Sequence, residues 1–284
     1  MRSRRSRGPA DPAPMTAYEK LILRGGPGIL AATLALAGAG AWVLRGFQVE
    51  AGTDVLLDQS DRDLAYYNQS RVDWETDEYV IVCCHRNEGW LTPGSLDVLN
   101  DLTRQLRSLP NVLRVLSITR VPLLRNRPMM MGLPVPVYLA DEEGRPNAKV
   151  DLEKARREFL GDPEKKVSGH TQALGNLISP DARDLSILVY LNVPDDLMRL
   201  EPERNRLLGR PRDAETARRL SEIEQPYQDS IQENNRRRTL LVDGIRRLGA
   251  EVRPKLDEPV RLSGLPIINI VLREHIKADI GTFG

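Results

Sequence analysis

Near its N-terminus the chain carries twenty consecutive residues without an ionisable side chain. This run extends from Gly25 to Leu44 and reads GGPGILAATLALAGAGAWVL. At the rise of an α-helix, about twenty apolar residues match the hydrocarbon thickness of a bilayer. The run therefore predicts one transmembrane helix, which we place at residues 21–47. Three residues are expected to flank the membrane: Arg24, Trp42 and Arg45.

The charges on the two sides of this run predict its orientation. Residues 2–24 carry six basic and two acidic side chains, whereas residues 45–63 carry two basic and five acidic ones. Basic residues are retained on the cytoplasmic side of a membrane. We therefore expect a cytoplasmic N-terminus and a periplasmic main domain at a bacterial inner membrane. Residues 1–20 should form a disordered, basic cytosolic tail.

A cleaved signal peptide is the alternative interpretation of the same run. Ala37, Ala39 and Ala41 are small residues of the kind found at signal cleavage sites. The retained anchor is favoured because the uncharged run is longer than a usual signal core. Trp42 also stands where an interfacial aromatic residue is expected.

Composition excludes several classes of function. The formal net charge is +1 and aromatic residues make up 5%, so the chain lacks both the basic excess and the stacking surface of a nucleic-acid-binding protein. Cys83 and Cys84 are adjacent, and His170 and His275 are isolated, so we predict neither a disulfide framework nor a metal site. The sequence contains no nucleophile elbow, zinc-protease motif, phosphate-binding loop or dinucleotide fingerprint, which predicts no catalytic residues, no cofactor and no enzyme.

The first part of the main domain reads as strand, helix, strand. Residues 78–85 form an apolar run typical of a central strand. Thr92 and Pro93 are suited to the N-cap and first position of a helix whose leucines recur at spacings of three and four as far as Leu109. Residues 112–119 are predicted as the next strand, which completes a βαβ unit.

Residues 120–284 are predicted to contain further helices and strands. Residues 120–148 read as a long excursion, and residues 151–160 as a short helix. A hairpin is expected around the turn at 180–184, with strands at 171–179 and 185–193. The remaining expected elements are a charged helical insertion at 195–225, a helix at 226–248, a strand at 260–263 and an amphipathic helix at 265–284.

Together these elements predict an α+β fold: one N-terminal transmembrane helix, then a ferredoxin-like, split βαβ domain at 48–264 with helical insertions. Several stretches resemble the N-terminal portion of resistance–nodulation–division (RND) exporters, in particular their hydrophobe-exporting MmpL-like branch. These are the exit from the first span (Phe47 to Tyr67), the strand DEYVIVCC, the helix and strand from Leu102 to Thr119, the hairpin from Leu174 to Leu191, and VRLSGLPIIN.

The resemblance implies the first span and first periplasmic porter domain of a proton-driven exporter of hydrophobic or lipid-like compounds. Its partners would be the lipid bilayer, a hydrophobic substrate and possible further subunits or copies of the chain. The predicted span contains no ionisable residue for a proton relay, so we expect a fragment that cannot transport alone, with 265–284 leading toward a missing second span. The alternative is a complete, single-pass anchored binding or scaffold protein.

Substrate contact is predicted for three consecutive methionines in the 120–148 excursion: Met129, Met130 and Met131. Methionine side chains adapt their shape to varied apolar partners, which suits the lining of a substrate cleft. An ordinary loop that covers a core edge is the alternative interpretation.

Overall fold

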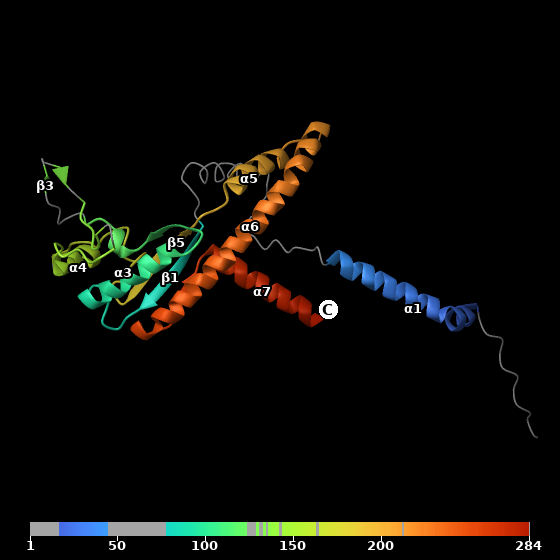
Figure 1. Cartoon of the computed structure of the whole chain (residues 1–284), viewed down its shortest axis with the longest axis horizontal. Helices are drawn as coiled ribbons and strands as arrows, with labels where there is room; N and C mark the ends of the chain where they lie inside the picture. Colours follow the sequence, from blue (N-terminus) through green and yellow to red (C-terminus); the bar gives the residue numbers. More distant parts are fainter. Residues whose placement is uncertain are drawn as a thin grey trace, which may run out of the picture. The chain divides into compact units, whose positions relative to one another are not determined.

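The structure is a computed structural model of the whole chain, and it describes residues 17–44, 78–123, 129–130, 133–134, 136–141, 144–162, 165–211 and 213–283. The chain divides into two compact units, Met1–Glu50 and Ala51–Gly284. The second unit contains every strand that the structure describes, and we call it the sheet domain (Figure 1).

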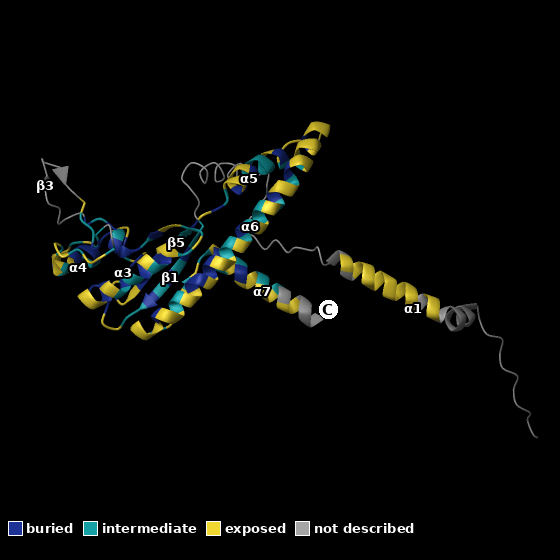
Figure 2. Ribbon diagram, viewed as in Figure 1, coloured by how far each residue is buried: buried dark blue, intermediate teal, exposed yellow. Residues whose placement is uncertain are grey.

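The first unit contains the helix α1, Ala17–Leu44, which includes Pro27. It begins four residues before the segment predicted at 21–47 and ends at Leu44, whereas residues 1–16 lie outside the described residues. Every described side chain of α1 is exposed (Figure 2). Across the described part of the chain, no helix combines the length and the apolar character needed to cross a bilayer. The predicted transmembrane helix is therefore not confirmed.

The sheet domain is built on four antiparallel strands, β1 (Tyr79–His85), β2 (Val112–Leu116), β5 (Asp184–Leu191) and β6 (Arg261–Ser263). Their order across the sheet is β2-β5-β1-β6. β5 runs antiparallel to both β1 and β2, so β1 and β2 are parallel to each other with β5 between them. The predicted α+β class is confirmed.

Helix α3, Pro93–Ser108, connects β1 to β2 and begins where the sequence predicts. The Thr92 side chain accepts a hydrogen bond from the Ser95 backbone N–H at 3.3 Å, which satisfies one of the free donors of the first turn. The predicted leucine stripe is buried at Leu96, Leu99 and Leu106. Burial of such a stripe against the sheet supplies most of the stability of the helix.

The strands alternate between a buried and a half-buried face. On β1, Val80 and Val82 are buried, whereas Ile81 and Cys83 are only half-buried. The sequence predicted a central strand at residues 78–85, and β1 confirms it by pairing with β5 on one side and β6 on the other. The buried face packs with α3 and with the C-terminal part of α6 into one core (Figure 2).

Short elements lie between β2 and β5. They are the 3₁₀ turn η2 (Ile118–Arg120), β3 (Met129–Met130), β4 (Leu133–Pro134) and α4 (Leu152–Leu160). The strand predicted at 171–179 is absent from this described stretch. Residues 171–177 form turns, with isolated bridges only at Leu174 and Ile178. The positive φ of 82° at Gly175 bends the chain away from an extended conformation.

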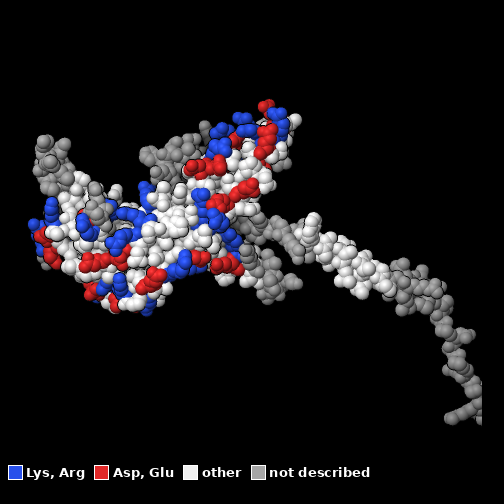
Figure 3. All heavy atoms as spheres, viewed as in Figure 1, with Lys and Arg blue, Asp and Glu red and all other residues white. Residues whose placement is uncertain are grey.

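Two helices form an arm that extends from the sheet domain: α5 (Asp195–Leu208) and α6 (Ala214–Val252), which the 3₁₀ turn η3 (Arg253–Lys255) follows (Figure 1). Helix α6 begins twelve residues before the predicted start at Pro226, because Pro226 lies inside the helix and does not begin it. Asp213 caps the true N-terminus by accepting from the Thr216 N–H at 2.7 Å. Acidic and basic side chains alternate over the arm (Figure 3).

The arm has an apolar core of its own. Its buried members come from the residue ahead of the α5 N-cap, from α5 itself and from the first half of α6: Val193, Leu197, Leu200, Leu207, Ile223 and Tyr227. The C-terminal half of α6 instead contributes Leu241, Val242 and Ile245 to the core of the sheet. One helix therefore belongs to two separate cores.

The last helix, α7 (Leu265–Phe283), follows β6 directly, as the sequence predicts. Pro266 and Ile270 are buried against the domain, whereas Leu265, Ile268 and Leu272 are 42–55% exposed. The backbone between β6 and α7 turns at Gly264, whose φ is +108°.

Candidate functional site

The predicted substrate-contact residues lie only partly within the described structure. Met129 and Met130 form β3, and their backbones pair with Pro134 and Leu133 of β4. Met131 lies outside the described residues, as do the side-chain positions of Met129 and Met130. The methionine lining of a substrate cleft therefore stays a prediction.

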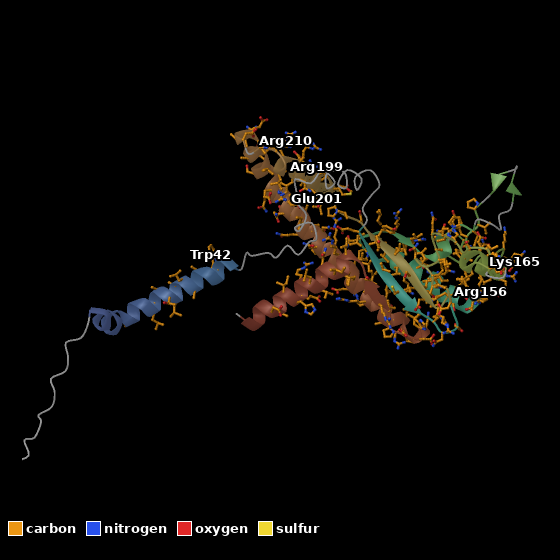
Figure 4. The ribbon with its side chains drawn as sticks, turned by 180° about the vertical axis from the view of Figure 1, so that it is seen from behind. Trp42, Arg156, Lys165, Arg199, Glu201 and Arg210 are labelled. Carbon is orange, nitrogen blue, oxygen red and sulfur yellow. The ribbon has the colours of Figure 1, made fainter. Side chains whose placement is uncertain are left out.

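The predicted membrane-flanking residues are associated with α1. Arg24 and Trp42 both belong to the helix, and the Trp42 side chain is 75% exposed (Figure 4). Arg45 follows the helix and lies outside the described residues. An exposed indole close to the end of an apolar helix fits an interfacial position.

A groove of about 420 Å³ lies between α5 and α6. The groove was not predicted from the sequence, because the expected charged insertion at 195–225 and the expected helix at 226–248 carried no sign that they pack together. The groove forms where Pro194 begins α5 and where Pro226 interrupts the hydrogen bonding of α6. Its other lining residues are mainly polar: Asp196, Arg199, Leu200, Asp229, Ser230, Glu233 and Arg237.

The charges of this groove are paired within the helices. Arg199, labelled in Figure 4, donates to Asp196 at 3.1 Å. Arg236 and Arg237 both donate to Glu233, at 2.7 and 2.9 Å, and these hydrogen bonds lower the pKa of Glu233 to about 2. Glu233 is therefore ionised at neutral pH and cannot serve as a general acid. The groove suits a small polar molecule better than a hydrophobic one.

A second cluster lies at one end of the sheet. His85 Nδ1 lies 2.7 Å from Asp184 Oδ1, and His85 Nε2 lies 3.4 Å from Asn87 Oδ1. The hydrogen bond to Asp184 is the main reason that the pKa of His85 is raised above its ordinary value. Cys83 shares this sheet face, but its Sγ contacts Ser186 Oγ at 3.7 Å. An imidazole oriented by a carboxylate is thus present without a nucleophile hydrogen-bonded to it.

The buried cysteine is also poorly suited to chemistry. Burial, and to a lesser degree the neighbouring Cys83, raises the pKa of Cys84 to about 12, so it remains a neutral thiol. Among the described residues, no three His, Cys, Asp or Glu side chains are placed to hold a metal ion.

Sequence comparison with known protein families and with curated proteins gives no match for this chain.

Proposed function

We propose that this chain is the N-terminal portion of a proton-driven RND-type exporter of hydrophobic or lipid-like compounds. In this proposal, residues 21–47 anchor the chain in the inner membrane of a bacterial cell, and the sheet domain is its first periplasmic porter domain. The chain is not transport-competent alone. The bilayer, further spans and further subunits or copies of the chain complete the exporter.

The pairing of the strands is the observation that carries this proposal. Apart from the inserted elements β3, β4, α4 and α5, the domain has the order β-α-β-β-α-β, formed by β1, α3, β2, β5, α6 and β6. In the sheet, β5 lies between the parallel strands β1 and β2. Both helices pack on the same face of the sheet. This arrangement agrees with the split βαβ, ferredoxin-like domain that the resemblance implies for a porter domain. A fold alone does not determine a function. The proposal therefore also depends on the position of this domain, which follows an apolar helix in the chain.

Helix α1 supports the anchor. It includes the whole run from Gly25 to Leu44, which has no ionisable side chain, and its described side chains are all exposed. Water would hydrate this apolar surface unfavourably, whereas lipid would cover it at no such cost. The same lack of charge means that proton transfer would need residues of other spans.

Cysteine labelling tests the topology. In a Cys83→Ser, Cys84→Ala background, Glu153→Cys places a thiol on exposed α4, and Ser3→Cys places one in the tail. With intact spheroplasts and a membrane-impermeant maleimide, we expect Glu153→Cys to react and Ser3→Cys to react only after lysis. Labelling of both thiols only after lysis, or release of the chain from membranes by alkaline carbonate, would overturn the anchor.

The exporter itself is tested in two ways. We expect the gene to continue in frame beyond Gly284 into further apolar helices that carry ionisable residues, whereas a stop codon there would support the anchored binding or scaffold protein instead. We also expect no proton-driven efflux from liposomes that contain only this chain. Efflux driven by this chain alone would contradict its role as one part of an exporter.

A further inference from the structure

The groove between α5 and α6 lies where no ion pair joins the two helices. Nearer the outer end of the arm, such pairs do join them: Arg204 lies 2.9 Å from Glu224, and Arg219 lies 2.8 Å from Glu203. The ion pairs of the described residues that line the groove instead stay within one helix. The space between the helices therefore stays open there, with a volume of about 420 Å³.

One carboxylate of this groove has no cationic partner in the described part of the chain. Asp196 is paired with Arg199, and Glu233 is paired with arginines of its own helix. Asp229 accepts a hydrogen bond only from the neutral side-chain amide of Gln225, at 2.8 Å. The lining contains three carboxylates and two guanidinium groups, so its net charge is −1. This uncompensated charge belongs to Asp229.

The groove combines this carboxylate with a second polar group and with apolar walls. The hydroxyl of Ser230 belongs to the lining and forms no hydrogen bond with another described residue. Pro194, Leu200 and Pro226 supply the apolar part of the lining. Sites for small molecules typically measure roughly 300–1,000 Å³ and place a few polar groups among apolar ones. The groove therefore has the size and the mixed lining of a site for a small organic ligand.

Two other classes of ligand fit this groove less well. The N-terminus of α5 would attract an anion, but Asp195 and Asp196 already place two negative charges in its first turn. A metal ion would need several ligating side chains. Among the described residues, no three His, Cys, Asp or Glu side chains are placed to hold one.

Hydration explains an unpaired carboxylate only where the surface around it is open. Glu251, also on α6, is an exposed carboxylate without an ion pair among the described residues, and it lies outside the groove. Asp229 differs from Glu251 because it lines a recess that also offers a free hydroxyl and apolar walls. This combination favours a ligand that carries a positive charge on a short carbon chain.

We propose that the α5–α6 groove binds a small organic ammonium ion. The carboxylate of Asp229 accepts charge-assisted hydrogen bonds from the ammonium group, whose charge neutralises the lining. A polar group at the other end of the ligand bonds with the Ser230 hydroxyl, and the carbon chain lies against the rings of Pro194 and Pro226. This site does not depend on the proposed exporter function.

The experiment titrates 4-aminobutan-1-ol into the full chain in a non-ionic detergent at pH 7. Ligand-observed NMR measures the dissociation constant, and butane-1,4-diol serves as a ligand of the same chain length without the positive charge. We expect the diol to bind at least about tenfold more weakly, because it cannot form the charge-assisted hydrogen bond with Asp229. Equal binding of the two ligands, or no binding of the amine, would overturn the proposal.

Asp229→Asn tests the carboxylate directly. The variant removes the charge but keeps an oxygen that can accept from Gln225, and it should bind the amine about tenfold more weakly or worse. Glu251→Gln is the matched control, because it removes an exposed, unpaired carboxylate from the same helix outside the groove. The control should bind the amine like the unmodified chain. An equal loss in both variants would reveal a general attraction to negative charge and would contradict a specific site.

A variant that fills the groove tests the location of the ligand independently of charge. Ser230→Leu places a larger apolar side chain in the lining and leaves Asp229 unchanged. It should weaken binding of the amine by at least about tenfold although the net charge of the chain is unaltered. Normal binding by this variant would place the amine elsewhere. If Ser230→Leu folds poorly, Asp229→Asn still decides, because it alters only an exposed side chain.

Discussion

Replacing Gly264 with alanine should strongly destabilise the sheet domain. Gly264 turns the chain from β6 into α7 with φ at +108°, a region that is essentially closed to other residues. An added Cβ would also overlap the backbone carbonyl oxygen of Tyr79 on the neighbouring strand β1. Strain of about 1–3 kcal/mol and a comparable overpacking cost together predict a loss of about 3–5 kcal/mol in the free energy of unfolding.

Two other glycines separate these two costs. Gly175 has φ at +82° with nothing within 4 Å of an added Cβ, so Gly175→Ala should lose only about 1–2 kcal/mol. Gly94 lies in α3, also with nothing within 4 Å, and Gly94→Ala should be neutral or stabilising by about 0.5 kcal/mol.

The assay is equilibrium urea unfolding of the full chain in mild detergent. Trp90 is fully buried, so its fluorescence reports on the core once Trp42 and Trp74 have been replaced by phenylalanine. The predicted order of stability is Gly94→Ala, then Gly175→Ala, then Gly264→Ala. If Gly264→Ala were as stable as Gly175→Ala, the close approach of the β6–α7 turn to β1 would be refuted.

Three further predictions concern the core and the end of the sheet. Leu241 is 0% exposed, so Leu241→Ala should cost about 2–5 kcal/mol in urea unfolding, and a cost below 1 kcal/mol would contradict the core packing. Because Asp184 raises the pKa of His85 in the folded state, this pair should stabilise the chain fully below about pH 6.5 and lose that effect as the pH rises through the folded value. His85→Gln should flatten that part of the pH profile of the melting temperature, and an unchanged profile would exclude the pair. At pH 8, a thiol reagent should modify only Cys83 in the folded chain and both cysteines in denaturant, because burial raises the pKa of Cys84 to about 12. Rapid reaction of both cysteines in the folded chain would contradict the burial of Cys84.

Local signals in the sequence predicted the elements whose stability is local. Thr92 and Pro93 marked the start of α3, and the leucine spacing marked its buried side. The alternation of Leu185, Ile187 and Val189 predicted β5, because a strand with one covered face imposes that period.

The errors arose where a residue had two possible meanings. Pro226 suggested a helix start, yet α6 continues through it, because the cap at Asp213 and the apolar contacts of Ile223 and Tyr227 outweigh one lost hydrogen bond. Residues 171–179 carry apolar side chains in two adjacent pairs and not in the alternation of a strand, and the turn at Gly175 lets Ala173, Leu177 and Ile178 enter the core.

The α5–α6 groove could not be predicted from the sequence, for a different reason. It depends on the packing of two helices, whereas the sequence predicted a charged helical insertion at 195–225 and a separate helix at 226–248. Pairing across elements is a property of packing, which single-sequence periodicity does not encode.

Because α6 packs into two cores, a movement of the arm is transmitted to the sheet. At the rise of an α-helix, the part of α6 that leads from Leu241 outward to Ala214 measures about 40 Å. A tilt of about 5° at the inner end would therefore displace the outer end by roughly 3 Å. Force applied to the outer end of α6 would reach α3 and the strands as torque, because the inner end of the same helix packs into the core of the sheet. The arm therefore acts as a lever: a molecule that binds its outer end can displace the elements that pack around the inner end of α6.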